Sequence, residues 1–118
     1  MRHQVRKKQL GRPKAHRSSM MQNLANSLVM HERIKTTEVR AKQLRSLVDR
    51  IISMSKKKDA REAIRYLSQQ GIQITASKKI CSALVKRYEG RSSGFTRITP
   101  FGLRKGDNAT IVYIELVA

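Results

Sequence analysis

The chain has 118 residues, enough for one domain with a modest core and too few for two. Hydrophobic residues make up 39% of it and tryptophan is absent, so the core must be built mainly from aliphatic side chains. Lysine and arginine number 26 against eight acids, which gives a formal net charge of +18. Such self-repulsion destabilises a compact chain unless an anionic partner neutralises it, and nucleic acid is the commonest such partner.

Several protein classes are disfavoured at once. The single cysteine, Cys81, excludes an intramolecular disulfide, as is typical of a reducing compartment. Apolar runs are far shorter than the ~20 residues of a membrane span, and the basic start leads into no apolar stretch of a secretory signal. An arginine-rich start also occurs in mitochondrial transit peptides, so an organellar source stays open. We expect a cytoplasmic protein.

Residues 1–17 are predicted to form an extended basic arm. The segment holds seven basic residues and two histidines but no acid, and it has no helical or strand period. Gly11 and Pro13 further disfavour regular structure. The alternative is a solvated tail without a specific role. We predict phosphate or base contacts from Arg2, His3, Arg6, Lys7, Lys8, Arg12, Lys14, His16 and Arg17.

Residues 18–118 are predicted to form a single globular domain. Residues 18–31 carry apolar side chains at helical spacing behind two serines that can cap a helix. Residues 33–36 are short, partly β-branched and flanked by polar residues, which indicates a short strand. Thr37 can then cap a second helix, from residue 38 to about 55, whose basic residues lie mostly off its apolar stripe.

Two further helices follow. Asp59 and Glu62 resemble a capping box, and the helix that they start can end at Gly71. Thr75 can cap the next helix, which Gly90 closes.

The period then changes to that of strands. Residues 95–103 and 111–117 are predicted to form a hairpin around the turn-rich residues 104–108. Pro100 indicates that the first strand is an edge strand or is bent there. The order helix, short strand, three helices and hairpin predicts a two-layer α/β (α+β) domain. In it, a small mixed sheet has helices on one face.

No catalytic or metal-binding pattern is present. The eight acids are scattered at positions that suit caps and intrahelical ion pairs, and no phosphate-cradling glycine loop occurs. Cys81 lies far in sequence from the three histidines, so no zinc spacing exists. We predict neither an enzyme nor a cofactor or metal site. An RNA-modifying enzyme stays an alternative, because a site can assemble in space from distant residues.

The hairpin offers further candidates for a nucleic-acid surface. Arg97, between Thr96 and Thr99, suits a sheet surface that contacts a nucleic-acid backbone, and Arg104 and Lys105 lie in the turn. The aromatic octapeptide of the RNA-recognition motif is absent, so base stacking on this sheet is not expected. A DNA-binding or nucleoid protein is the other alternative. It would need a recognition helix, a dimer interface or a minor-groove wedge, and none is evident.

A family resemblance runs through the whole chain. Residues 27–37, Ser-Leu-Val-Met-His-Glu-Arg-Ile-Lys-Thr-Thr, resemble the hallmark stretch of the bacterial large-subunit ribosomal protein seventeen family. Similar segments follow in the family's order at residues 1–3, 16–17, 41–45, 94–98, 104–109 and 114–117. The chain departs from the family pattern between Val5 and Lys14, at Ser93 in place of a common glycine, and at Phe95 in place of a common tyrosine.

This resemblance implies a structural constituent of the large ribosomal subunit, placed on its outer surface near the peptide exit tunnel. It implies binding to large-subunit ribosomal RNA and contact with a neighbouring ribosomal protein of the L-thirty-two family. Charge neutralisation and shape fit would dominate, with little reading of base edges. The resemblance adds RNA contacts at His31, Arg33, Lys35, Thr36, Thr37, Lys42 and Arg45 to the arm residues.

Overall fold

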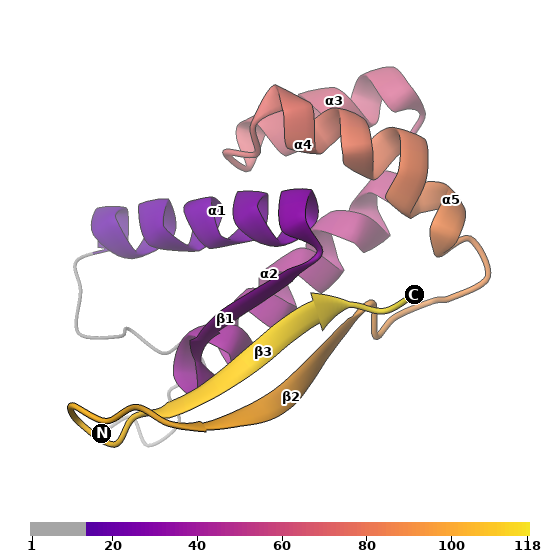
Figure 1. The fold of residues 1–118 in the computed structure, drawn as a ribbon. Helices are drawn as coiled ribbons and strands as arrows, with labels where there is room; N and C mark the ends of the chain where they lie inside the picture. Colours follow the sequence, from indigo (N-terminus) through magenta and orange to yellow (C-terminus); the bar gives the residue numbers. More distant parts are fainter. Residues whose placement is uncertain (1–13) are drawn as a thin grey trace, which may run out of the picture.

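The computed structural model describes residues 14–118, so the predicted contacts Arg2, His3, Arg6, Lys7, Lys8 and Arg12 lie outside them. Helices and a three-stranded sheet form two layers (Figure 1). The elements are α1 (Lys14–His31), β1 (Arg33–Thr37), α2 (Glu38–Lys56), α3 (Ala60–Gln69), α4 (Ile74–Lys79), the π-helical turn η1 (Ile80–Leu84), α5 (Val85–Arg87), β2 (Thr96–Leu103) and β3 (Thr110–Leu116). The predicted order of helix, short strand, helices and hairpin is confirmed.

The sheet has the strand order β1-β3-β2, and both pairings are antiparallel. The prediction of a mixed sheet is therefore wrong, because the direction of β1 depends on how the intervening helices return the chain to β3. The expectation from Pro100 is confirmed: β2 is an edge strand, and its register shifts between Pro100 and Gly102. Such a bulge leaves one residue without a direct partner and re-aims its side chain.

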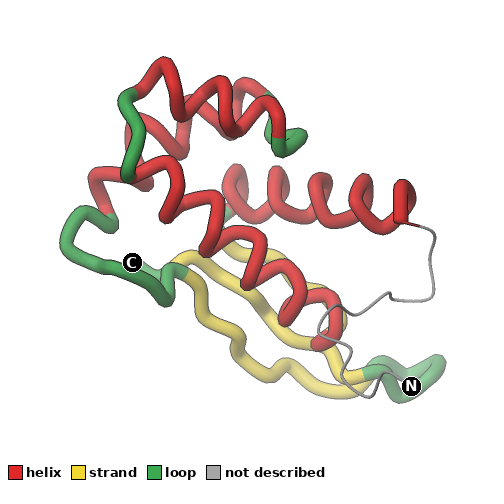
Figure 2. The backbone as a smooth tube through the Cα atoms, turned by 180° about the vertical axis from the view of Figure 1, so that it is seen from behind, coloured by secondary structure: helices red, strands yellow, loops and turns green. Residues whose placement is uncertain are grey.

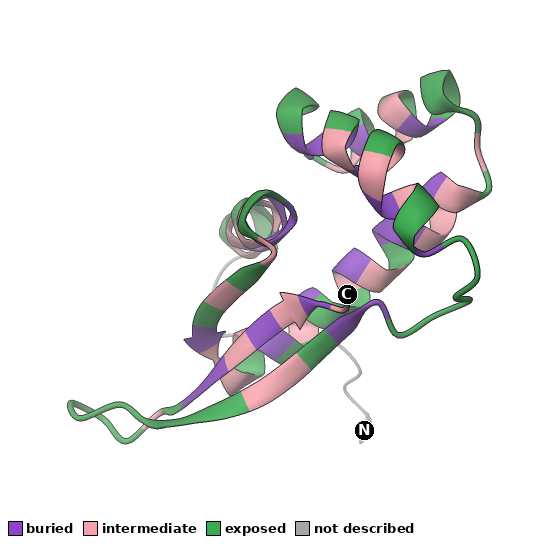
Figure 3. Ribbon diagram, turned by 45° about the vertical axis from the view of Figure 1, so that its right-hand side comes forward, coloured by how far each residue is buried: buried purple, intermediate pink, exposed green. Residues whose placement is uncertain are grey.

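Helices cover one face of the sheet. Seen from behind, α2 runs across the strands (Figure 2), whereas the view in Figure 1 looks onto the opposite face, which no described helix covers. Strand β3 alternates accordingly: Val112, Ile114 and Leu116 are buried, and Tyr113 and Glu115 between them are half-buried. The end of the hairpin projects past the helices, and Figure 3 shows the exposed residues gathered there.

The core lies between the helices and the face of the sheet that they cover. Leu44, Ile52, Leu84 and Ile114 are fully buried in it. At the end opposite the hairpin turn, an aromatic pair closes the core. The rings of Tyr88 and Phe95 lie 5.1 Å apart, and the Tyr88 hydroxyl donates a hydrogen bond to the carbonyl oxygen of Val117.

Two predicted helix starts need correction. Helix α1 begins at Lys14 rather than at residue 18, so residues 14–17 of the predicted arm are helical. Thr75 is not a cap, since α4 begins at Ile74 with Gln73 as its N-cap residue.

A buried asparagine explains the start of α4. Asn26, on α1, accepts a hydrogen bond from the backbone N–H of Gln73 at 2.9 Å through its Oδ1 atom. Its amide nitrogen donates to the carbonyl oxygens of Gln22 and Gly71. The contact therefore comes from another helix, which a local capping rule does not consider.

The predicted starts of α3 and α2 hold, whereas the last helix ends at Arg87 rather than at Gly90. The Oδ1 atom of Asp59 accepts a hydrogen bond from the backbone N–H of Glu62 at 2.8 Å, which confirms this side of the capping box. Thr37 is the N-cap residue of α2, although its side chain makes no capping hydrogen bond. None of the helices in residues 14–118 has the length and hydropathy that a bilayer crossing requires.

Candidate nucleic-acid interface

The uncovered face of the sheet, which we call the outer face, begins with β1. Along this strand Arg33 and Lys35 are exposed, while Thr36 is buried at 9% exposure. Successive side chains of a strand point to opposite faces, so Arg33 and Lys35 share one face and Thr36 points to the other. Of the five predicted contacts in residues 31–37, Thr36 is thus the one whose side chain is buried.

Two aromatic rings lie between these cations. The Arg33 guanidinium lies 3.8 Å from the ring centroid of Tyr113, and the Lys35 ammonium lies 4.5 Å from that of Phe101. The two rings meet edge to face with centroids 5.4 Å apart. Cations placed over ring faces are held by electrostatic attraction to the ring quadrupole. The outer face therefore carries an ordered row of Arg33, Tyr113, Phe101 and Lys35.

The sequence-based prediction did not include these rings. Tyr113 and Phe101 belong to the two strands of the hairpin, and Tyr113 pairs in register with both Lys35 and Thr99. Cross-strand aromatic pairs are a recognised source of sheet stability, so two rings on neighbouring strands were a usable signal. The contact between the two rings could not be predicted from the alternation along β2, because the bulge after Pro100 changes which residues face one another.

Two acids near the outer face, Asp107 and Glu115, form ion pairs with arginine side chains. Arg97, a predicted contact, is exposed and lies opposite Glu115, with 3.8 Å between Nη1 and Oε1. In the turn, Arg104 donates two hydrogen bonds to Asp107, at 3.0 Å and 2.7 Å. These bonds, with one from the backbone N–H of Ala109, lower the pKa of Asp107 to about 2. The carboxylates of Asp107 and Glu115 thus have cationic partners within the protein.

A hollow of about 340 Å³ lies where β1, the start of α2 and the end of the hairpin meet. Among residues 14–118, three cationic side chains line it, from Lys35, Arg40 and Arg104. Arg40 was not predicted as a contact, although its place in the first turn of α2, three residues after Thr37, brings it beside β1. The hollow is lined by Lys35, Thr36, Thr37, Arg40, Phe101, Leu103, Arg104 and Ile111.

The remaining predicted contacts are spread over other surfaces. Lys42 and Arg45 are exposed on α2, the helix on the opposite face of the sheet, and Lys42 forms an ion pair with Glu38 at 2.8 Å. Lys105 is exposed in the hairpin turn and His31 at the end of α1. The predicted set is therefore not one contiguous patch. Arg33 and Arg97 both lie opposite Glu115 at one end of β3, whereas Lys35, Thr37 and Arg104 line the hollow at the end of the hairpin.

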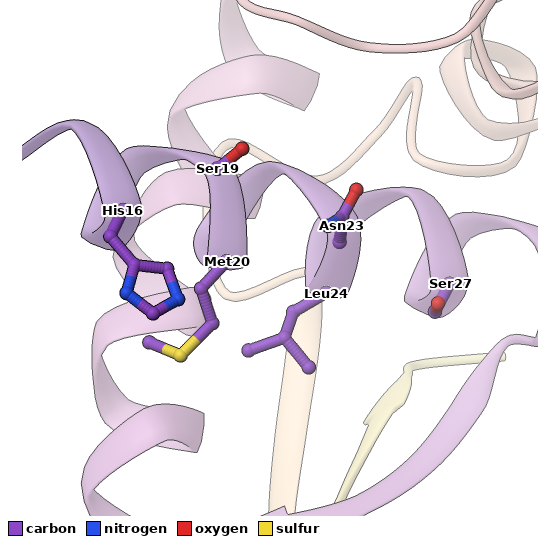
Figure 4. A pocket seen from close by; sticks show the side chains of 6 residues that line it. All are labelled: His16, Ser19, Met20, Asn23, Leu24 and Ser27. Carbon is purple, nitrogen blue, oxygen red and sulfur yellow. The ribbon is translucent and has the colours of Figure 1, made fainter.

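A second hollow, of about 360 Å³, lies along α1. Its described lining residues come from this helix, and Figure 4 shows His16, Met20 and Leu24 pointing to the same side of it. Among the described residues of the lining, His16 is the one that titrates. Lys14 and Arg17, the neighbouring predicted contacts, also lie in the first turn of α1. This hollow offers far less positive charge than the hollow at the hairpin.

The corner between α1 and β1 is fixed by an ion cluster. Glu32 adopts φ +65°, and its carboxylate accepts hydrogen bonds from Arg87 at 2.7 Å and 3.1 Å. The Lys79 ammonium lies 3.0 Å from the same carboxylate. Hydrogen bonds from Arg87 and then Lys79 lower the pKa of Glu32 to about 2. The cluster joins the start of β1 to the α4–α5 segment and so positions the outer face.

Within residues 14–118, no three His, Cys, Asp or Glu side chains gather into a group that could hold a metal ion. Cys81 is half-buried in the η1 turn, and burial raises the pKa of its thiol. A raised pKa disfavours the reactive thiolate.

Comparison with known proteins agrees with the resemblance noted in the sequence. The profile of the family described as Ribosomal protein L17 matches residues 20–117. Proteins named Large ribosomal subunit protein bL17 are similar along nearly the whole chain. That of Syntrophotalea carbinolica is 42% identical over 121 residues, covering 99% of this chain and 75% of that protein. That of Rubrobacter xylanophilus is 40% identical, covering 99% and 96%, respectively.

Proposed function

We propose that this chain, which belongs to the ribosomal protein L17 family and is a structural component of the large ribosomal subunit, binds large-subunit ribosomal RNA through its basic N-terminal segment and the outer face of its sheet. As a member of this family it is not an enzyme. The observation that carries the proposal is the concentration of cations on β1 and the hairpin. The acids beside these cations already form ion pairs with arginine.

Charge supports the proposal in two places. Five of the 26 basic residues lie in residues 1–13, which contain no acid, and 21 lie in residues 14–118 with all eight acids. Each phosphate that a protein neutralises releases counterions, which favours binding at low salt. Arginine side chains on the outer face can bind phosphate oxygens bidentately, and Lys35 can act as a point charge. This mode positions RNA without reading base edges.

The family resemblance also supports a finer assignment. We infer that the chain lies near the peptide exit tunnel, contacts a protein of the L-thirty-two family and works in the cytoplasm as part of the ribosome. Lys42 and Arg45 on α2, and His31 at the end of α1, would then contact RNA segments other than those on the outer face.

Binding to a transcript of the large-subunit RNA, measured across a salt series, tests the proposal. We expect log K to fall linearly with log salt, with a slope of about 0.7–0.9 for each phosphate contact. Replacing Arg2, Arg6, Arg12 and Arg17 by alanine should flatten the slope by about 2.8–3.6 if each contacts one phosphate. A second variant, Arg33→Gln with Lys35→Gln, should flatten it further.

The matched control replaces Arg61 and Arg65, which are exposed on α3, by glutamine. We expect this control to alter the slope less than either test variant, although it removes the same kind of charge. Equal slopes for all variants would mean that the RNA attraction is diffuse, and would contradict the proposal. A matched DNA duplex, bound as tightly as the RNA at equal salt, would favour a general polyanion binder instead.

A further inference from the structure

We propose that the hollow at the end of the hairpin binds one unpaired nucleotide of RNA, with the base against Phe101 and the phosphate among Lys35, Arg40 and Arg104. The inference rests on the proposed RNA binding and adds a chemical class of ligand to it. Binding of an unpaired nucleotide differs from phosphate contact alone, because an unpaired base exposes a flat apolar face. In a duplex, that face stays stacked on the neighbouring bases.

The size and lining of the hollow fit such a ligand. Its volume of about 340 Å³ lies within the range of about 300–1,000 Å³ that is typical of sites for small molecules. Its apolar wall comprises Phe101, Leu103 and Ile111, and its other lining residues are the three cations and two threonines. An apolar wall beside concentrated positive charge matches a molecule that joins a flat ring to an anion.

The apolar wall is exposed in an unusual way for so charged a protein. Phe101 is 55% exposed and Leu103 is 65% exposed, and both line the same hollow. Neighbouring apolar side chains that remain in water on a polar surface commonly mark a binding site. Here they lie on the edge strand β2, just after its bulge, and at the projecting end of the hairpin.

The Phe101 ring contacts two neighbouring side chains. Tyr113 meets it edge to face at 5.4 Å, and the Lys35 ammonium lies 4.5 Å from its centroid. A ring held by such neighbours loses little further freedom when a base stacks on it, which favours binding. Base stacking on an aromatic side chain contributes to single-strand binding whatever the base identity.

The charges around the hollow complement a phosphate. Arg104 is held by its two hydrogen bonds to Asp107, which fix the direction of its guanidinium. Among the ion pairs within residues 14–118, none involves Lys35 or Arg40. Asp107 pairs with Arg104, and the described residues that line the hollow include three cations and no acid, which leaves positive charge for an anion to neutralise. An acidic peptide would use this charge but would leave the aromatic wall without a flat partner.

Two short RNA hairpins of equal length and charge test the inference with the full chain. One contains a single unpaired 2-aminopurine, and in the other that base is paired. At matched salt we expect the unpaired probe to bind about 5- to 100-fold more tightly and its fluorescence to change on binding. Phe101→Ala should remove this preference and leave the affinity for the paired probe unchanged, whereas Phe101→Tyr should retain it.

Ile74→Ala is the matched control, because Ile74 is also 55% exposed but lies on α4. It should keep the preference, and urea unfolding of each variant verifies that the fold is intact. Equal binding of the two probes, or a preference that survives Phe101→Ala, would overturn the inference. A photo-reactive group at position 101 that cross-links in intact large subunits to a protein rather than to RNA would overturn it as well.

The two proposals fail differently. If the chain does not bind the large-subunit transcript in a salt-dependent way, the proposed function itself is wrong. If transcript binding persists while Phe101→Ala and Arg40→Gln leave the preference between the hairpins unchanged, only the nucleotide site is wrong.

Discussion

Replacing Glu32 by glutamine should destabilise the fold at neutral pH, because it removes the carboxylate that Arg87 and Lys79 share. For a fully buried group, lowering the pKa from 4.5 to about 2 would correspond to about 3 kcal/mol. The Glu32 side chain is 38% exposed, and solvent reduces such pairs to roughly 0–1 kcal/mol each. Two pairs converge here, so we expect a loss of about 1–2 kcal/mol at pH 7.

The stability difference between the native chain and Glu32→Gln should depend on pH. The pKa of Glu32 is lowered in the folded protein, so its contribution is fully present above pH 4.5 and is lost as the pH falls toward 2. The difference in unfolding free energy between the native chain and Glu32→Gln should therefore narrow below pH 4.5. Urea unfolding at pH 7 and pH 3.5 measures it, since urea leaves the ionic strength unchanged.

Glu89→Gln is the matched control, because Glu89 is an exposed glutamate close to the same helical segment. It should change stability by less than about 0.5 kcal/mol. In an Arg87→Gln background, Glu32→Gln should cost less than it does alone, because one of its two partners is already gone. Equal stability of Glu32→Gln and the native chain at pH 7 would refute the reasoning, as would a deficit that is unchanged at pH 3.5.

Three further substitutions probe the core and the turns, each by urea unfolding. Burial raises the pKa of Asp49, so the native chain loses stability as pH rises through that pKa; Asp49→Asn should be the more stable form at pH 7, with no advantage at pH 3. Gly71 has φ +80°, and Gly71→Ala should cost about 1–2 kcal/mol, whereas Gly90→Ala, in open space, should cost much less. Tyr88→Phe removes the hydrogen bond to Val117 and should cost about 0.5–1.5 kcal/mol. An unchanged midpoint for Gly71→Ala or Tyr88→Phe, or an Asp49→Asn variant less stable at pH 7, would contradict the corresponding argument.

Local signals predicted local structure well. Asp59 and Glu62 mark the start of α3 because their hydrogen bond spans only three residues. Pro100 identifies an edge strand because proline has no N–H to offer a second neighbour. The period of two along residues 111–117 likewise indicates β3, which the structure forms over Thr110–Leu116.

Long-range contacts explain what the sequence did not predict. The hydrogen bond from Gln73 to Asn26 joins residues 47 positions apart, so no local rule could move the start of α4 from Thr75. The antiparallel pairing of β1 with β3 depends on the path of the helices between them. Thr36 was predicted as an RNA contact together with its neighbours, because the family resemblance is read residue by residue. In a strand, alternate side chains point inward, and that of Thr36 is one of them.

The candidate site also combines residues that could be predicted from the sequence with contacts that depend on the fold. Arg97 and Arg104 were predicted from their charge and their place in the hairpin, and Arg33 and Lys35 from the family resemblance. The row that they form with Tyr113 and Phe101 requires the three strands to pair in their observed register. Arg40 joins the hollow only because the start of α2 lies beside the hairpin.

The most direct test of RNA binding by the outer face is the reactivity of Lys35 toward an acetylating reagent, read by mass spectrometry. Lys35 is exposed in the described structure and should react readily in the isolated chain. In intact large subunits it should be protected, and ribonuclease treatment should restore its reactivity. Equal labelling of Lys35 in the isolated chain and in the subunit, or protection that survives complete RNA digestion, would contradict the account.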